Sequence, residues 1–462
     1  MSYRHDPVYR SVRWLRDRSR KPEGLVAHWA AQTGMEPADI RIRLGLTNYK
    51  PFERARVVAE MAPRVGHGRT AAARWLSLHV AATPEEARTE LESKSARLSA
   101  GAVPPLLFGD HATVAWTLPH APGLEALAEL IEPDRFHTLA ARVPGLGAAA
   151  RARLVRYVPL KRALLVHADP TTGRRHWLKL FNAEDGAGAM LGLREVRAWY
   201  EHGAFASRVP RLVHYDTSLH LMVMDEVPGT PFTRLLAGGG RVEPFAELGR
   251  ALAELHAVPT VPWRAWSFAQ EHGGLRRHMR GARRALPALA DRIDRLVDRL
   301  GRDMPQGQDG FAPIHGNLFG DQILYDETAA PGRRIGVVDW DAWCHGDPHY
   351  DLGRMIAHLV YVARLEGQST GGMTEAAEAL LEGYRMVAGH AAVDRARLTW
   401  QLAVALLLRA KISSLRKLVP GWPRHMALMV AEAEDVLDGG GALARPRSVM
   451  RSNRAAGELS AP

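Results

Sequence analysis

Three short sequence blocks occur twice, in the same order, in the first half of the chain. The paired blocks are residues 49–55 with 157–163, 74–78 with 176–180, and 103–123 with 209–229. Chance similarity in one block would not reproduce the other two at a nearly constant offset, so we predict a duplicated module. The duplication constrains the fold, because each copy must form the same kind of structural unit.

Each copy is predicted to be a small sheet with one helix. In the second copy, residues 162–168 and 176–181 have strand patterns and flank the turn Asp169–Gly173, which is typical of a hairpin. Residues 191–200 have helical spacing, and residues 219–227 have the pattern of a further strand. The first copy follows the same scheme.

Beyond Gly238–Gly240 the pattern becomes helical. Apolar residues recur at helical spacing in six segments, and two short strands lie between them. The helical segments are residues 245–256, 274–300 (broken near Pro287), 352–365, 373–388, 395–417 and 425–437, and the strands are 323–325 and 335–338. A sheet-rich half followed by a helix-rich half predicts a two-lobed α+β fold.

These patterns divide the chain into five parts. They are a basic helical N-terminal segment (1–40), a degenerate sheet module (41–135), a sheet-rich lobe (150–228), a helical lobe (229–438) and a disordered tail (439–462). The tail is rich in glycine and arginine and lacks apolar periodicity.

Composition narrows the class of protein. The chain has 462 residues, of which 46% are hydrophobic and 24% charged, as in a globular protein. Its longest apolar run, residues 402–408, stops at Arg409, so no membrane span is expected. Cys344 is the only cysteine, which excludes an intramolecular disulfide. The N-terminus lacks the apolar segment of a signal peptide, and a cytoplasmic protein is the expectation.

The formal net charge of +11 is carried mostly by arginine. Such a balance is compatible with a nucleic-acid or other anionic partner, or with charge spread over solvated helix faces. No basic run is interleaved with stacking aromatics, so nucleic acid is not the favoured partner.

Lys179 lies among apolar residues in the second strand of the predicted hairpin, and Glu195 follows in a helix. A strand lysine paired with a helix carboxylate can hold nucleotide phosphates. A lysine alone at an edge strand would more simply extend to solvent.

The segment from His315 to Asp341 is more specific. It contains a histidine-led loop, a short hairpin and then Asp339 within Val-Val-Asp-Trp. This order of loop, hairpin and aspartate is how phosphoryl-transfer enzymes position an acceptor hydroxyl and a metal ion. Alternatively, Asp339 would be a turn residue and His315 a buried core histidine without a catalytic role. The presence of the Gly346–Leu352 motif after the loop, the hairpin and the aspartate favours the phosphoryl-transfer interpretation.

Together these motifs resemble the aminoglycoside phosphotransferase and choline-kinase-like superfamily, which has a protein-kinase-like fold, over residues 150–437. The resemblance implies ATP and Mg²⁺ as cofactors. It also implies one role for each of several residues. Lys179 would contact the phosphates and Glu195 would pair with it; Met224, Glu226 and Val227 would form the adenine hinge; Asp339 and Gln322 would bind Mg²⁺; and Asp351 would orient the catalytic loop. The fold implied is two-lobed and protein-kinase-like, with an extra, duplicated N-lobe-like sheet module at the N-terminus.

The catalytic loop departs from the family pattern. With His315, the loop offers Asn317 where the family has the aspartate that accepts the acceptor's proton, and an amide cannot take that proton. Asp321 is a candidate substitute carboxylate. In addition, residues 159–162 lack the glycine that would let the backbone approach phosphates.

Ser77 occupies the lysine position in the first copy, so this copy is expected to be a cap or a platform without nucleotide. The acceptor site is expected in the helical insertion at residues 240–305. This insertion carries Arg276, Arg277, Arg280, Arg283 and Arg284. Such a cluster favours a neutral or anionic acceptor over a polycationic one, although a solvated helix face explains each arginine equally well.

Two functions are favoured by the sequence, ahead of a third, a nucleic-acid-associated protein that would use the basic surface. The first is an ATP- and Mg²⁺-dependent phosphotransferase that acts on an alcohol such as a sugar, a related metabolite or an antibiotic, with slow turnover because of Asn317. The second is a pseudokinase that binds nucleotide or a protein partner without phosphoryl transfer. Retention of Lys179, Glu195 and Asp339 favours the first, and loss of the base and the glycine favours the second.

Overall fold

The computed structural model describes most of the chain. The described residues are 2–17, 23–33, 35–63, 74–96, 98, 102–144, 146–147, 152–169, 172–237, 241–366 and 370–440. The tail predicted for residues 439–462 lies outside them from residue 441 onward.

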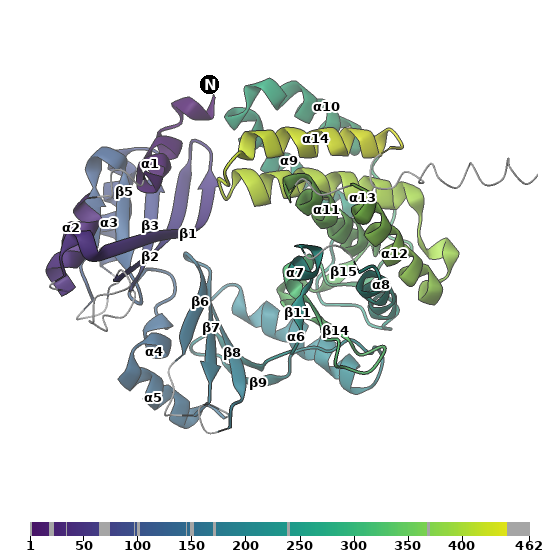
Figure 1. The fold of residues 1–462 in the computed structure, drawn as a ribbon, viewed down its shortest axis with the longest axis horizontal. Helices are drawn as coiled ribbons and strands as arrows, with labels where there is room; N and C mark the ends of the chain where they lie inside the picture. Colours follow the sequence, from purple (N-terminus) through teal and green to yellow (C-terminus); the bar gives the residue numbers. More distant parts are fainter. Residues whose placement is uncertain are drawn as a thin grey trace, which may run out of the picture.

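Two five-stranded antiparallel sheets with the same strand order form the first half of the chain (Figure 1). The N-terminal sheet runs β1 (Ile40–Lys50), β2 (Arg54–Pro63), β3 (Arg74–Ala81), β5 (Thr113–Thr117), β4 (Leu106–Phe108). The second runs β6 (Arg153–Val158), β7 (Arg162–Ala168), β8 (Arg175–Phe181), β10 (Leu221–Asp225), β9 (Leu212–Asp216). One helix follows the third strand of each sheet, α3 (Pro84–Ser95) in the first and α6 (Gly186–Glu201) in the second.

Backbone conformation repeats along with topology. Phe52 (φ 59°) and Leu160 (φ 65°) occupy the left-handed region in the turn between the first two strands of their sheets. Ala112 (φ 44°) and His220 (φ 53°) do so directly before the fifth strand of each sheet in chain order, β5 and β10. Left-handed residues other than glycine are uncommon. Their recurrence at equivalent positions therefore supports the duplication predicted from the sequence.

A shared core joins the two sheets. Trp116 and Val114 from the first sheet and Tyr157, Leu178 and Val223 from the second belong to one buried apolar cluster. The helices α4 (Leu127–Ile131) and α5 (Pro133–Arg142) contribute to the same cluster and connect the sheets in the chain (Figure 1). The sequence analysis did not predict these two helices.

The second half is helical, as predicted. Its helices are α7 (Phe232–Ala237), α8 (Glu243–His256), α9 (Phe268–Ala285), α10 (Ala290–Arg302), α11 (His349–Glu366), α12 (Thr370–Ala388), α13 (Arg395–Arg409) and α14 (Trp422–Leu437). Its short strands are β11 (Thr230–Pro231), β12 (Ala312–Ile314), β13 (Ile323–Tyr325), β14 (Ile335–Val337) and β15 (Cys344–Gly346). The break predicted near Pro287 separates α9 from α10, since proline cannot continue a helix interior.

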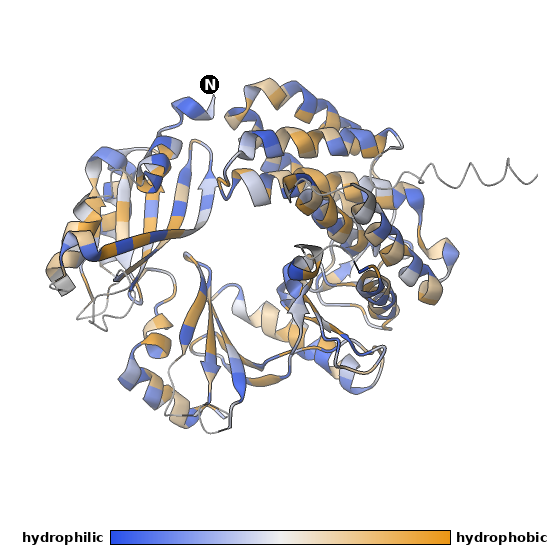
Figure 2. Cartoon of the chain, in the orientation of Figure 1, coloured by the Kyte–Doolittle hydropathy of each residue, from blue (hydrophilic) through white to orange (hydrophobic). Residues whose placement is uncertain are grey.

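The helix at the centre of this lobe is unusually apolar. A π-helical segment, Ala410–Leu415, continues α13, so the helix does not stop at Arg409. By length and hydropathy alone the span Arg395–Leu415 could cross a membrane, but 83% of its apolar 18-residue window is buried inside the protein. It packs against α11 and α14, and Figure 2 shows orange, hydrophobic residues between blue, hydrophilic ones along these helices. The structure therefore uses this span as a core helix.

The N-terminal segment ties the first sheet to the helical lobe. It forms α1 (Pro7–Arg16) and α2 (Glu23–Thr33). Asp6 caps α1 by accepting a hydrogen bond from the Val8 amide (2.8 Å) and also accepts one from the Tyr49 hydroxyl. The Tyr49 amide in turn donates to the carbonyl of Arg416 (2.8 Å), which lies between α13 and α14. The first sheet, the second sheet and the helical lobe are thus arranged around one centre (Figure 1).

Candidate functional site

A cavity of about 510 Å³ lies between the second sheet and the helical lobe. Alternate residues of a strand face the same side of a sheet. Leu164, Lys179 and Met222 stand side by side on neighbouring strands, and all three line this cavity. Leu324 and Val338 line it from the helical lobe. Apolar surfaces on two sides and a polar end make a slot of the right size for a nucleotide.

The predicted hinge residues lie at this cavity. Met224 is on β10, and Glu226 and Val227 follow that strand; all three line the cavity. Glu226 also forms an ion pair with Arg175 (3.0 Å) on the adjacent strand. The segment connects the sheet to the helical lobe, which is the position expected of a hinge.

Four charged side chains meet at the polar end of the cavity. The ammonium of Lys179 donates to Asp339 Oδ1 and to Asp341 Oδ1 (2.6 Å to Asp341). The guanidinium of Arg162 donates to Asp341 Oδ2 (2.6 Å) and lies 3.9 Å from Asp339 Oδ1. Two cations and two carboxylates thus form one network. Burial alone would raise the pKa of Asp339, but the charges of Lys179 and Arg162 outweigh burial and hold this pKa well below its usual range.

Backbone geometry brings the two aspartates to the same partner. Asp339 follows β14 with a left-handed backbone (φ 71°) and begins the 3-10 turn Trp340–Ala342. Trp340 is buried between them and donates from its indole nitrogen to the Val337 carbonyl (3.0 Å). The side chains of Asp339 and Asp341 therefore both reach Lys179.

The predicted pair between Lys179 and Glu195 is wrong. Glu195 accepts hydrogen bonds from the Trp343 indole (3.0 Å) and the Thr260 hydroxyl (2.9 Å) instead. The reason is the close packing of α6 on the turn after Asp339: a Cβ on Gly192 would lie 2.9 Å from the Trp340 carbonyl oxygen. Ala189 and Leu193 form the side of α6 that lines the cavity, whereas Glu195 does not line it.

The structure also argues against Gln322 as a metal ligand. Its carbonyl oxygen accepts from the Phe319 amide (3.0 Å), and its NH₂ group donates to Asp339 Oδ2 (3.2 Å). A metal ligand must present oxygen, and here the oxygen is used by the backbone. The extra methylene of glutamine, relative to asparagine, allows this fold-back. Gln322 thus positions Asp339.

His315 fixes the catalytic loop and does not line the cavity. It is fully buried, and its Nε2 lies 3.1 Å from the Val338 carbonyl, next to Asp339. Its amide and that of Gly316 donate to the two oxygens of Asp351 (2.7 and 3.1 Å). Burial acts to raise the pKa of Asp351, but the hydrogen bond and charge of His256 lower it below its ordinary value. Asp351 therefore holds the loop, as the resemblance implied.

Asn317 and Asp321 differ in their access to the cavity. Asn317 is half-buried and is absent from the lining of the nucleotide-sized cavity. Asp321, four residues later, is exposed and lines that cavity. Of the loop's two candidates for interaction with an acceptor, Asp321 is therefore the better placed.

The arginines of the helical insertion lie elsewhere. Arg276, Arg277, Arg280, Arg283 and Arg284 are exposed on α9 and do not line the nucleotide-sized cavity. Arg283 pairs with Asp294 (2.8 Å), and Arg284 stacks on Phe52. They form a solvated helix face in this structure, so they provide no support for an acceptor site at this position.

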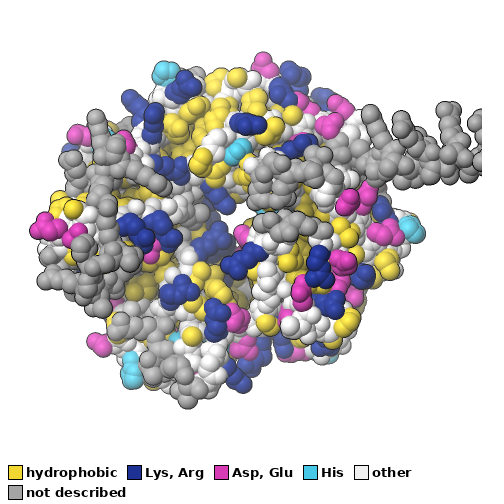
Figure 3. All heavy atoms as spheres, in the orientation of Figure 1, with side chains coloured by type: hydrophobic (Ala, Val, Ile, Leu, Met, Phe, Trp, Pro, Cys, Tyr) yellow, Lys and Arg dark blue, Asp and Glu magenta, His cyan; other side chains and the backbone are white. Residues whose placement is uncertain are grey.

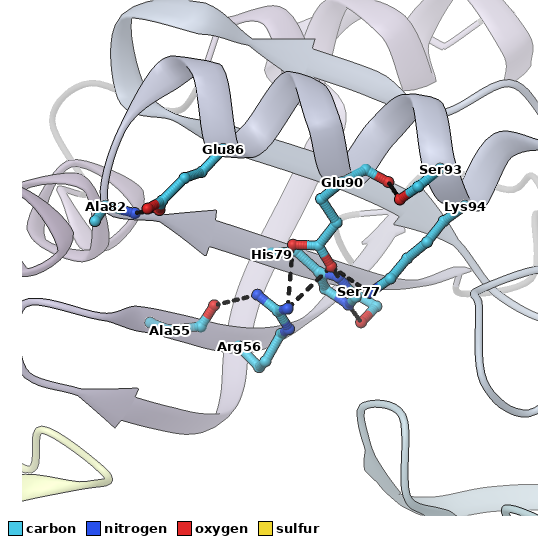
Figure 4. A network of polar contacts seen from close by, with 9 residues as sticks. All are labelled: Ala55, Arg56, Ser77, His79, Ala82, Glu86, Glu90, Ser93 and Lys94. Carbon is cyan, nitrogen blue, oxygen red and sulfur yellow. Dashed lines mark hydrogen bonds and ion pairs between the residues drawn. The ribbon is translucent and has the colours of Figure 1, made fainter.

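The equivalent position in the first sheet is closed. Ser77 is fully buried and its hydroxyl lies 2.9 Å from His79 Nε2. His79 Nδ1 lies 2.8 Å from Glu90, which also binds Arg56 and Lys94 (Figure 4). Burial lowers the pKa of His79 to about 4. Ser77, His79 and Glu90 are thus linked by hydrogen bonds in this order. The serine is nevertheless buried from solvent, so this network joins α3 to the sheet.

Sequence reasoning missed Arg162 and Asp341. Asp341 stands two residues after Asp339, and two carboxylates flanking a buried tryptophan were a usable signal. In the sequence, Arg162 stands out only as part of the loop without glycine. Arg162 and Lys179 reach the same aspartates because β7 pairs with β8. In this register Arg162 pairs with Phe181, and Leu164 pairs with Lys179.

The donor set fits a magnesium ion. Carboxylate oxygens are the preferred protein ligands of Mg²⁺, and Asp339 and Asp341 offer them side by side. Lys179 and Arg162 now balance these carboxylates, and both cations are also suited to phosphate oxygens.

Comparison with known proteins agrees with this geometry. Residues 170–397 match the phosphotransferase enzyme family. No curated protein sequence matches the chain significantly. Among solved structures, a microcompartment-associated aminopropanol kinase is similar at 20% identity, over 67% of this chain and 98% of its own, with a TM-score of 0.51.

Two further structures align less closely. A choline/ethanolamine kinase family protein from Mesorhizobium loti aligns at 18% identity over 66% of this chain and 94% of its own, with a TM-score of 0.44. An aminoglycoside phosphotransferase from Streptomyces rimosus aligns at 20% identity over 59% and 97%, with a TM-score of 0.42. At such identities the similarity concerns the fold. The match over residues 170–397 thus agrees with the fold of the chain, which is two-lobed and protein-kinase-like and is preceded by an extra sheet module.

Proposed function

We propose that this protein transfers the γ-phosphoryl group of ATP to the hydroxyl of a small molecule, with Mg²⁺ as the metal. The match of residues 170–397 to the phosphotransferase enzyme family supports the reaction class. The observation that carries the proposal is the network of Lys179, Arg162, Asp339 and Asp341 at the end of a nucleotide-sized cavity. Such a cluster combines cations for the phosphates with carboxylates for the metal.

Each part of the cavity has a role in this proposal. The adenine ring would lie between the apolar side chains of the sheet and those of Leu324 and Val338, beside Met224, Glu226 and Val227. Lys179 and Arg162 would leave the carboxylates and bind phosphate oxygens. Magnesium held by Asp339 and Asp341 would supply positive charge to the transferred phosphoryl group.

In the transfer step, Asp321 supplies the carboxylate that accepts the proton. The acceptor oxygen forms a bond to the γ-phosphorus while the bond from that phosphorus to the bridging oxygen breaks, and ADP leaves. The proton of the acceptor hydroxyl passes to the carboxylate of Asp321, because the amide of Asn317 cannot accept it. Positioning and electrostatics supply most of the catalysis of phosphoryl transfer, so this arrangement suffices for turnover at a reduced rate.

A pseudokinase is the second candidate, and a specific observation favours it. Arg162 stands in the loop that lacks glycine and, with Lys179, already neutralises both aspartates. A nucleotide has to displace these ion pairs. A protein in which these ion pairs persist would bind a nucleotide or a protein partner without transferring a phosphoryl group.

Calorimetric titration with a non-hydrolysable ATP analogue, with and without Mg²⁺, tests the proposal. We expect Mg²⁺-dependent binding that is lost in Asp339→Ala and kept in Asp298→Ala, an exposed aspartate on α10 that does not line the nucleotide-sized cavity. Screening of alcohols for ADP release would then identify an acceptor. Binding without any transfer would support the pseudokinase, and no binding would refute both nucleotide-based functions.

A further inference from the structure

A second, larger cavity adjoins the nucleotide-sized one. Its volume is about 1160 Å³, and it is lined by three parts of the molecule: the N-terminal module, the second sheet and the turn before α14. Arg156 and Asp321 line both cavities. Asp321, the proposed proton acceptor, is therefore accessible from this second space, which lies where an acceptor must approach.

The lining of this cavity is strongly basic. It includes Arg16, Arg41, Arg43, Arg156 and Lys417, against the carboxylates of Asp17 and Asp321. Figure 3 shows lysine and arginine side chains gathered around the hollow at the centre of this face. Arg43 is neutralised by Glu60 (2.7 Å). Within the described part of the chain, by contrast, Arg41, Arg156 and Lys417 form no ion pair.

Arg41, Arg156 and Lys417 are exposed residues on the lining of the cavity, so an anion in the cavity can reach them from solvent. Burial lowers the pKa of Lys417, and the neighbouring charges of Arg156 and Arg409 lower it further, with Asp321 acting in the opposite direction. Burial lowers the pKa of Arg416 too, with Arg156 and Arg162 adding to the effect. The lining carries more cations than carboxylates, and such an excess of positive charge favours a bound anion.

The basic side chains that line the cavity, here called the basic wall (Arg16, Arg41, Arg43, Arg156 and Lys417), are held in place by contacts between segments that lie far apart in the sequence. Arg16, at the end of α1, donates to the carbonyls of Leu418 and Lys417 (2.9 Å to Lys417) and to the Thr47 hydroxyl (3.0 Å). Arg416 donates to the Asn48 side chain (2.6 Å). These bonds use neutral oxygens, so they fix the positions of the basic side chains without cancelling their charge.

We infer that the acceptor carries a phosphate group and that the N-terminal module supplies half of its binding site. This inference rests on the proposed function. A dianion would be bound between Arg41 of β1 and Lys417 of the turn before α14, with Arg156 nearer the nucleotide. Its hydroxyl group would extend to Asp321. The N-terminal module is thus part of the substrate site, beyond the cap or platform that its degenerate sequence suggests.

The size and chemistry of the cavity select this ligand class. Its volume holds a sugar phosphate or a phosphorylated polyol. Three separate cations suit the two charges of a phosphate monoester better than one carboxylate. Aromatic side chains, on which bases of a nucleic acid would stack, do not line it among the described residues.

Titration of the full-length protein with inorganic phosphate and with glucose 6-phosphate, at low ionic strength, tests the inference. Loss of one cation from the wall is expected to weaken binding of either probe about tenfold in Arg41→Gln and in Lys417→Gln. Both residues line only the second cavity. Arg88→Gln, on the exposed surface of α3, is the matched control and should bind phosphate as the parent does. Glucose should not compete.

Failure of the inference is distinguishable from failure of the proposed function. Equal phosphate affinity in the parent, Arg41→Gln and Lys417→Gln, or no phosphate binding by the parent, would overturn the inference even if the ATP analogue binds. Loss of binding of a single-stranded oligonucleotide in the same two variants, without an effect on phosphate, would also overturn it. Absence of analogue binding, with phosphate binding that depends on Arg41, would refute the function and leave an anion site.

Discussion

Gly316 offers a sharp test of how the catalytic loop is held. Its φ of 77° lies in the left-handed region, and a Cβ there would collide with the Ala342 carbonyl oxygen while also approaching Cys344 Sγ at 3.2 Å. Backbone cannot move aside as a flexible side chain can. The Ala342 carbonyl belongs to the turn that carries Asp341, so relief of the clash requires displacement of the site itself.

Gly332 separates the two costs in Gly316→Ala. Its φ is 81°, yet no atom lies within 4 Å of a Cβ built on it. Gly332→Ala should therefore show only the cost of the left-handed backbone, about 1 kcal/mol. Gly316→Ala adds overpacking against backbone, typically about 1–3 kcal/mol, for a total of about 2–4 kcal/mol.

Urea unfolding followed by tryptophan fluorescence measures the difference between the two variants. The ATP analogue should also bind more weakly to Gly316→Ala and unchanged to Gly332→Ala, because His315 and Val338, beside Asp339, move with the loop. Unfolding free energies that agree within about 0.5 kcal/mol would refute the packing of the loop on Ala342.

Two further predictions concern carboxyl groups, one in the loop after His315 and one buried on α9. Asp321→Asn should lower turnover by about 10²–10⁴-fold and Asn317→Asp should raise it, each with little change in nucleotide affinity; unchanged ADP release in both would remove the loop from proton transfer. Glu271 is fully enclosed on α9, and burial raises its pKa from 4.5 to about 8. The native state then binds more protons than the unfolded state, so stability should fall as pH rises from 4.5 to 8, and Glu271→Gln should abolish that slope; an equal slope in the variant would contradict this assignment.

The regular elements were predictable because their patterns are local. The hairpin of β7 and β8 has the strand alternation and turn residues that a hairpin needs, and the break at Pro287 follows from proline geometry. The loop at His315 and the aspartate at 339 were likewise found from spacing, and the structure brings Lys179 and Asp339 into contact. Local pattern does not reveal α4 and α5, whose short apolar stripes acquire meaning only between two sheets.

The partners of the site residues depend on how closely elements approach. Glu195 binds Trp343 because Gly192 lets α6 sit against the Trp340 carbonyl, and no sequence spacing encodes that distance. Gln322 turns its oxygen to Phe319 for an equally local reason, the length of its side chain. The basic cavity joins residues more than 370 positions apart, such as Arg41 and Lys417, so it was beyond any reading of the linear chain.

The N-terminal module meets both lobes of the phosphotransferase fold, and this changes how the fold can move. In a protein with two lobes and one hinge, each lobe can swing freely about the connecting segment. Here the second sheet shares a core with the first, and the first is hydrogen-bonded through Tyr49 and Arg16 to the turn at residues 416–418 of the helical lobe. The lobes are therefore joined at both ends, as a ring is. Widening the cleft at Val227 has to strain or release the junction at Tyr49, so access of ligands and integrity of the module are mechanically coupled.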